Sequence, residues 1–424
     1  MDSREAKTLF SVGKKHFVGW FLLTCFCVFQ FSLQGSVGIL ADGLKASLNL
    51  DAASLSILSS SFYYSYVFMQ IPVGFIFDRF GVRIIASLAL LMVAVGSGIF
   101  ATATSLPVAI FARILLGLAC SFGFLGLAVA TGKWFPARYF AVMIAATECL
   151  GMLGVAGLNN IMSQIVTHWD WRVACWFSAV VAMVIAFSVF LFAPQDDMIS
   201  AEVRKIHGHK PHVVLMKSLK TVAGYREVWL GGLFAFAAFA VVTVFAGLWG
   251  IPFLMSTAKL DLVQATSLVS TIYIGTALSS PLVGWLSGFI RAHVLMGSSM
   301  ILAFILTLVL IFGPKTSLLG LYVLIFLLGF VSSVYQLPFS IVNKVVADHV
   351  KGVAMGVTNI ICMVSGPILQ PMIGYVLIYA GKRQGDLNFE SYPPEAFQYA
   401  LLSLAACLLG AVFVGFSLKD RKAS

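Results

Sequence analysis

Apolar runs of about 20 residues recur from one end of the sequence to the other. A run of this length crosses the hydrocarbon core of a bilayer as an α-helix, which satisfies its backbone polar groups internally. Only 10% of the 424 residues are charged, whereas soluble domains carry roughly 25%. The sequence therefore predicts an all-α polytopic membrane protein and excludes an ordinary soluble one.

Twelve transmembrane helices are expected, and the longest polar stretch lies between the sixth and the seventh. We therefore expect an N-terminal six-helix bundle at 1–193, a cytoplasmic central loop at 194–227 and a C-terminal six-helix bundle at 228–424. The expected spans lie near 17–40, 53–76, 83–104, 107–131, 139–166, 172–193, 228–255, 263–288, 292–313, 317–343, 352–379 and 396–418.

The basic residues are distributed unevenly between the two sets of loops. If the N-terminus is cytoplasmic, inside segments hold 20 of the 27 Lys and Arg residues and outside segments hold six. This bias predicts that both termini are cytoplasmic, and we expect the protein in a bacterial inner membrane. It also accounts for the net charge of +10, so the expected partner is the lipid bilayer and no nucleic acid. Nothing in the sequence demands an oligomer, and a monomer is expected.

The two halves of the chain repeat each other at a nearly constant spacing. Gly74 and Gly284 are 210 residues apart, and Gly117 and Gly329 are 212 apart. Such a spacing, close to half the chain, indicates duplicated six-helix bundles related by a pseudo-twofold axis. In one large class of transporters, repeats of this kind surround a site near the bilayer midplane.

The stretch 74-GFIFDRFGVR-83 falls in the predicted loop between helices two and three. It resembles the signature Gly-x-x-x-Asp-Arg-x-Gly-x-Arg of the major facilitator superfamily, and Arg113 with Gly117 resembles that family's helix-four pattern. The resemblance implies alternating access and a cytoplasmic gate. The implied gating residues are Gly74, Asp78, Arg79, Gly81, Arg83 and Arg138. Because the second copy has Gly288 where Asp78 stands, the latch is expected on one half only.

Within the superfamily, residues 133–154 resemble a branch with lysosomal dipeptide transporters and solute importers of intracellular bacteria. The antiporter pattern with Gly-Pro in helix five is not met, which disfavours a drug exporter. An exporter of small organic compounds nevertheless stays an alternative.

Two charged residues lie deep in the predicted spans. Arg113 is about 9–12 Å deep at 1.5 Å per residue, where a charge costs roughly 3 kcal/mol or more. It is interpreted as a ligand for a substrate anion, as a proton-coupling element, or as a structural tie between helices. Glu148 lies about 14 Å deep in span five. The two form a candidate coupling pair, with a permanent salt bridge as the alternative.

Uncharged polar side chains at similar depth are the other candidates for substrate binding. Gln30 and Gln34 are spaced i, i+4 and should share one helix face. For each candidate, an interhelical hydrogen bond is the competing interpretation. The candidates at depth are Gln30, Gln34, Tyr63, Tyr64, Tyr66, Gln70, Asn159, Asn160, Tyr273, Tyr335, Gln336, Asn359 and Gln370. Those favoured for substrate binding are Gln30, Gln34, Tyr64, Tyr335, Gln336 and Asn359. Trp229 and Trp249, near helix ends, are interpreted as interfacial residues.

Together these features predict a secondary transporter that moves a small polar organic solute by alternating access. Amino acids, short peptides or small organic acids are expected as substrates, carried by proton-coupled symport into the cell or by uniport. A transporter-like solute receptor is the alternative from another class. The chain shows no Walker motif, no catalytic constellation and no metal-ligand spacing among its cysteines. We therefore expect no enzyme activity, no cofactor and no metal.

Overall fold

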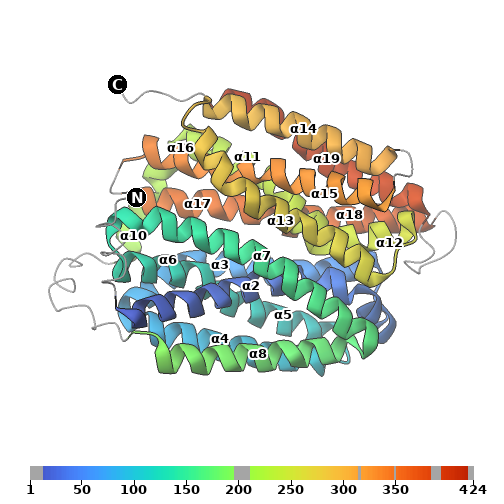
Figure 1. Cartoon of the computed structure of the whole chain (residues 1–424), viewed down its shortest axis with the longest axis horizontal. Helices are drawn as coiled ribbons and strands as arrows, with labels where there is room; N and C mark the ends of the chain where they lie inside the picture. Colours follow the sequence, from blue (N-terminus) through green and yellow to red (C-terminus); the bar gives the residue numbers. More distant parts are fainter. Residues whose placement is uncertain (1–12, 195–210, 314–316, 348–349, 383–392, 419–424) are drawn as a thin grey trace.

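The computed structural model describes residues 13–194, 211–313, 317–347, 350–382 and 393–418. These residues are helical almost throughout, and no strand occurs among them. The helices lie side by side in one bundle whose long axes run roughly parallel (Figure 1). We call the end where the first helix begins and the last helix ends the terminal end, and the opposite end the remote end.

Every predicted span has a helical counterpart in the first half of the chain. The fourth span is broken into two helices, and a 3₁₀ turn, η1 (Ala137–Tyr139), precedes the fifth. The helices are α2 (Lys14–Leu48), α3 (Ala52–Phe80), α4 (Val82–Ala101), α5 (Leu106–Cys120), α6 (Phe122–Trp134), α7 (Phe140–His168) and α8 (Trp171–Phe192).

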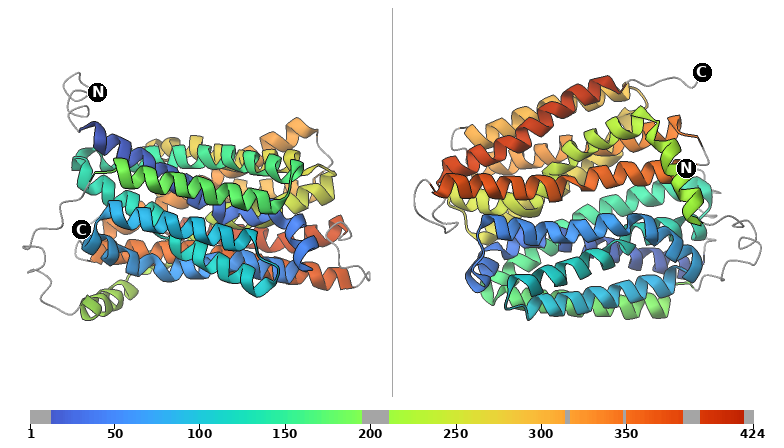
Figure 2. Two further views of the ribbon diagram at one scale, coloured as in Figure 1. Left: turned by 90° about the horizontal axis from the view of Figure 1, so that it is seen from below. Right: turned by 180° about the vertical axis from the view of Figure 1, so that it is seen from behind.

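The second half has the same number of spans, three of which contain a break or an irregular turn. The elements are α11 (Arg226–Ala240), η2 (Val241–Trp249), α12 (Gly250–Ala258), α13 (Leu262–Leu286), α14 (Ala292–Phe312), α15 (Leu318–Ser332), η3 (Ser333–Gln336), α16 (Leu337–Val345), α17 (Lys351–Met363), α18 (Ser365–Lys382) and α19 (Pro394–Ser417). The link expected as a loop at 194–227 contains a further helix, α10 (Pro211–Ala223), which lies at the terminal end (Figure 2).

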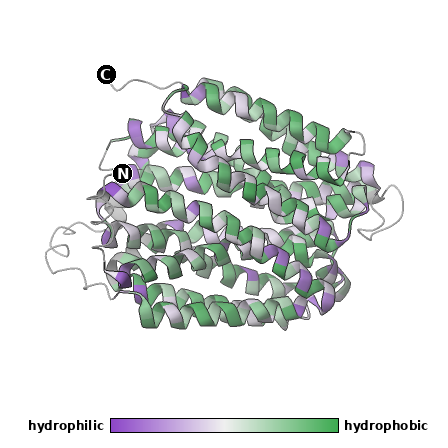
Figure 3. Cartoon of the chain, in the orientation of Figure 1, coloured by the Kyte–Doolittle hydropathy of each residue, from purple (hydrophilic) through white to green (hydrophobic). Residues whose placement is uncertain are grey.

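Eleven continuous helical segments in the described residues are long and apolar enough to cross a membrane. Helix α3, the counterpart of the second predicted span, is not among them. Its first half carries Ser56, Ser59, Ser60 and Ser61, all of them buried. These hydroxyls lie inside the bundle, whose helices consist of hydrophobic residues along most of their lengths (Figure 3).

The internal repeat is visible in the backbone. The fourth span breaks at Ser121, between α5 and α6. The tenth span loses α geometry at Ser333, where η3 begins, 212 residues later. A Cβ atom on Gly117 would lie 2.1 Å from the carbonyl oxygen of Phe62, and one on Gly329 would lie 2.3 Å from that of Ile272. The two glycines therefore allow the same close approach of helices in each half.

Helix caps and a tight turn explain three residues at the ends of the helices. At the remote end, the side chains of Asp51 and Asp261 accept hydrogen bonds from the backbone N–H groups of Ser54 and Gln264, and so cap α3 and α13. At the terminal end, Gly81 has φ 79°, which favours glycine. The tight turn expected at Gly81 between helices two and three is confirmed.

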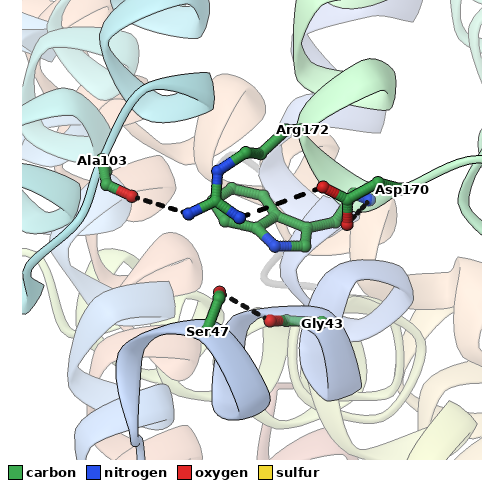
Figure 4. Close-up of polar contacts among 6 residues, drawn as sticks. Gly43, Ser47, Ala103, Asp170 and Arg172 are labelled. Carbon is green, nitrogen blue, oxygen red and sulfur yellow. Dashed lines mark hydrogen bonds and ion pairs between the residues drawn. The ribbon is translucent and has the colours of Figure 1, made fainter.

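A second remote-end contact joins α8 to its neighbours (Figure 4). The guanidinium of Arg172 lies 4.3 Å from the ring of Trp171, donates to the carbonyl of Ala103 at 3.2 Å, and lies 3.9 Å from Asp170. Trp171 is buried, and a Cβ atom on Gly43 would lie 2.5 Å from its ring. This cluster stabilises the remote end of the first half.

Contacts between the two halves are described near the remote end and at mid-depth. Near the remote end, Asn160 on α7 donates to the hydroxyl of Ser270 on α13 at 3.1 Å. A Cβ atom on Gly374 of α18 would lie 2.7 Å from the carbonyl oxygen of Ala52, where α3 begins. The halves are therefore in close contact at the remote end.

Candidate functional site

Arg113 is fully buried within the first half. Its Nη1 donates to the carbonyl of Leu33 at 2.8 Å, and its Nη2 lies 3.4 Å and 3.5 Å from the carbonyls of Ser59 and Gln34. The guanidinium also lies 4.8 Å from the centre of the Phe62 ring. A backbone carbonyl has two lone pairs, so a carbonyl within a helix can accept a hydrogen bond from Arg113 in addition to its bond within the helix. These contacts tie α5 to α2 and α3, which favours the structural interpretation.

The space beside Arg113 is too small for an organic solute. The cavity there measures about 10 Å³, roughly the room that one water molecule needs. Among the described residues, the Nε of Arg113 has no hydrogen-bond partner. A single water is the largest molecule that fits in the space beside it. The polar and sulfur-containing residues that line the cavity are Ser36, Ser97, Met162, Cys175 and Ser178.

Glu148 lies on the boundary between the halves. Its carboxylate accepts a hydrogen bond from the Tyr335 hydroxyl at 2.5 Å, so α7 of the first half is joined to η3 of the second. The Gln336 amide nitrogen lies 3.4 Å from the Tyr335 hydroxyl and donates to the Ser280 hydroxyl at 3.0 Å. Glu148, Gln336 and Ser280 are partly exposed. The structure thus groups three sequence candidates into one polar cluster, which we call the Glu148 cluster.

The expected pair of Arg113 and Glu148 does not form. Arg113 lies among α2, α3 and α5, whereas Glu148 bonds to the other half. Within the described residues, an ion pair joins Arg172 to Asp170 instead. Similar depths make the two residues a candidate pair, but depth along a helix does not fix the direction in which a side chain projects.

Gln30 and Gln34 have different roles, although their spacing predicted one shared face. Gln30 accepts from the backbone N–H of Phe124 at 3.0 Å and donates to Tyr66 at 3.1 Å. It therefore satisfies a backbone donor that the break at Ser121 leaves without an intrahelical partner. The amide nitrogen of Gln34 points to the other half, 3.9 Å from the sulfur of Met363, and among the described residues its Oε1 has no hydrogen-bond partner.

Asn359 and Gln70 form another bond between the halves. The amide nitrogen of Asn359 on α17 donates to the Gln70 side chain on α3 at 3.2 Å. Tyr64 is 56% exposed and lies 3.4 Å from the carbonyl of Pro367. Its neighbour Tyr63 is fully buried. The interior position expected for Tyr64 therefore belongs to Tyr63.

The structure describes the predicted gate only in part. The side chains of Gly74, Asp78 and Arg79 lie outside the described residues. Arg83 lies over the ring of Phe190 at 5.1 Å, and Arg138 over the ring of Tyr139 at 4.7 Å. The latch at Asp78 stays a prediction.

Four buried residues near the remote end, Tyr63, Thr243, Trp249 and Gln370, are bonded to one another in a way that the sequence does not predict. The Tyr63 hydroxyl and the Gln370 amide lie 3.4 Å and 2.7 Å from the carbonyl oxygen of Thr243. Trp249, expected at the membrane interface, is fully buried and donates to the carbonyl of Gln370 at 3.1 Å. The polarity of Tyr63 and Gln370 was the available signal, whereas Trp249 near a helix end resembles an interfacial residue.

The many long apolar helices among the described residues indicate an integral membrane protein. Residues 21–371 match the model of the Major Facilitator Superfamily, and the chain belongs to that family. The family and the relatives below are transporters rather than enzymes.

Curated relatives include transporters of organic acids. The chain is 25% identical to an uncharacterized transporter of Bacillus subtilis, YybO, over 62% of this chain and 63% of that protein. It is 24% identical to the 4-hydroxybenzoate transporter PcaK of Pseudomonas putida, over 66% and 69% of the two chains. It is 20% identical to a probable galactarate/D-glucarate transporter of Escherichia coli, over 87% and 89%. The matched part thus spans less than two thirds of YybO.

Solved structures show the same fold. The nucleoside transporter NupG has a TM-score of 0.73 at 14% identity, over 95% of this chain and 100% of that one. A bacterial homologue of the human lysosomal transporter Spinster, in an inward-facing and unoccupied conformation, has a TM-score of 0.71 at 14% identity, over 96% and 97%.

Proposed function

We propose that this protein is a secondary transporter that moves a small polar organic solute by alternating access, with protons coupled to transport at Glu148. The observation that carries the proposal is the hydrogen bond of Glu148 to Tyr335 across the two halves. We further propose, on the distribution of Lys and Arg in the loops, that both termini are cytoplasmic, and we propose import as the direction of transport.

A proton on Glu148 would change the contact between the halves. A hydrogen bond to an ionised acceptor is roughly twice as strong as one between neutral groups. Proton uptake removes that charge and weakens the bond from Tyr335, which frees the second half to move. Alternating access requires the two bundles to rock about a central site, and the Glu148 cluster lies on this boundary.

The substrate classes that we propose are amino acids, short peptides and small organic acids. Arg113, the one basic residue deep in a span, is already bonded to backbone carbonyls. A dicarboxylate such as the galactarate named for some relatives would therefore find no free cation there. A carboxylate at the boundary can bind an ammonium group, which favours amino acids and peptides.

Uptake into proteoliposomes tests the proposal once a ligand is known. A thermal-shift screen of amino acids, dipeptides and organic acids identifies the ligand, because binding stabilises the folded state. We expect wild-type uptake to rise when the outside is acidified, and Glu148→Gln to lose that dependence. Tyr335→Phe should retain pH-dependent uptake at a lower rate. If Glu148→Gln keeps the full pH dependence, Glu148 is not the coupling residue.

A further inference from the structure

The segment η2 (Val241–Trp249) is a π-helix of nine residues between the α-helices α11 and α12. π-helices hold well under 1% of residues in proteins, and most are single turns at functional sites. All nine residues of η2 are buried. A π segment of this length needs interactions from neighbouring helices that compensate for its departure from α geometry.

Hydrogen bonds hold η2 near its beginning and at its end. The Thr243 carbonyl accepts from the Gln370 amide at 2.7 Å, and the Thr243 hydroxyl lies 2.8 Å from that of Ser365. At the other end, the indole N–H of Trp249 donates to the Gln370 carbonyl at 3.1 Å. Gln370 thus bonds to both ends of the π segment. These partners belong to α18 of the same half.

A second set of contacts with η2 comes from the first half, beside the packing of η2 within its own half. The Tyr63 hydroxyl lies 3.4 Å from the Thr243 carbonyl. A Cβ atom on Gly38 of α2 would lie 3.1 Å from the carbonyl oxygen and 3.2 Å from the Cα of Leu248. One on Gly35 would lie 3.4 Å from the Cα of Gly247. The halves therefore meet backbone against backbone at η2, in the part of α2 nearer the remote end.

We propose that η2 is the remote-end gate and changes its helix type as the gate opens. It is π-helical while the halves are in contact and becomes α-helical when they separate. On separation η2 loses Tyr63 and the surface of α2, so the compensation for π geometry falls and the α form is favoured. The inference rests on the proposed alternating access, but its test measures structure and needs no transported solute.

Two pairs of spin labels separate gate opening from the change of helix type. The first pair, at Ala46 on α2 and Ala258 on α12, measures the distance between the halves at the remote end. The second pair, at Leu233 on α11 and Ala258, measures the length of the helix that contains η2. Because i→i+5 bonding places more residues in each turn, a π segment is shorter than an α-helix with its 1.5 Å rise. The labels are placed in full-length protein whose seven native cysteines are replaced.

Gly38→Val drives the halves apart, because its side chain would overlap the backbone of Leu248. The matched control is Gly157→Val on α7, where nothing lies within 4 Å of the added Cβ. We expect both distances to lengthen in Gly38→Val and neither to change in the control. Tyr63→Phe, which removes only the hydroxyl, should populate the same longer distances to a smaller extent, and it replaces Gly38→Val if that variant does not fold.

The outcomes are decisive in either direction. If only the distance between the halves lengthens, the gate opens without a change of helix type and the inference is wrong. If neither distance changes, η2 is not the gate. Both results would leave open whether the protein transports a solute in proteoliposomes, so failure of this inference is distinct from failure of the proposed function.

Discussion

At the residue scale, the two deep charges are used differently. Arg113 bonds to three backbone carbonyls of its own half, whereas Glu148 bonds to a phenol of the other half. A charge that is satisfied within one rigid unit stabilises that unit. A charge at the boundary between two units can respond when they move. This difference favours a framework role for Arg113 and supports the proposed coupling role of Glu148.

Arg113→Lys tests the framework role. Lysine keeps the charge but lacks the planar fork that reaches several carbonyls, so we expect the free energy of unfolding to fall by roughly 1.5–3 kcal/mol, the worth of a hydrogen bond to a charged group. Thermal unfolding in detergent measures the change. Arg172→Lys, at the partly exposed pair with Asp170, should cost less than about 1 kcal/mol. Unchanged stability together with lost ligand binding would instead identify Arg113 as a substrate ligand.

At the scale of the elements, helices approach one another closely where one of them has a glycine, which has no side chain to separate the two backbones. The carbonyl oxygens of Phe62 and Ile272 lie where a Cβ atom would stand on Gly117 and Gly329. The pairs α3 with α5 and α13 with α15 are therefore held at backbone distance. Such pairs should move as single bodies during any rearrangement.

Substituting these glycines should be costly and similar in both halves. Gly117→Ala and Gly329→Ala each force a backbone shift, and overpacking of this kind typically costs about 1–3 kcal/mol. Gly410→Ala in α19 is the control, because nothing lies within 4 Å of its added Cβ. There alanine should leave stability unchanged or raise it by up to about 1 kcal/mol. Equal unfolding temperatures for all three variants would contradict the close contacts.

The sequence predicts where the helices lie along the chain better than it predicts which side chains of different helices are in contact. Hydrophobic length located every span, and the glycine requirement located the turn at Gly81, because both are local properties. The choice between Tyr63 and Tyr64 depends on the rotation of α3, which the mixed polarity of that helix does not reveal. The π geometry of η2 arises from contacts with α2, α3 and α18, so no periodicity within 241–249 could predict it.

At the scale of the whole molecule, the contacts described between the halves give the bundle a direction. Gly35, Gly38 and Gly374 bring backbones of the two halves together in the part nearer the remote end. The basic loops predict that the terminal end faces the cytoplasm. If the proposed orientation is right, these contacts lie on the outer side of the membrane.

Labelling of single cysteines in intact cells checks this orientation. A membrane-impermeant maleimide should label Ala46→Cys at the remote end without permeabilisation. Lys217→Cys on α10, exposed at the terminal end, should be labelled only after permeabilisation. The reverse pattern would place the termini outside and invert the proposed direction of transport.

The shared contact at Gly117 and Gly329 has a consequence for how this chain can vary. Neighbouring apolar positions tolerate exchange among residues of similar volume, but these two sites admit hydrogen alone. In a library with every substitution at every position, selected for growth on the solute, nearly all substitutions at these two positions should therefore be lost. The two positions are 212 residues apart. Such data would reveal the internal repeat of the chain even where the side chains of the two halves differ.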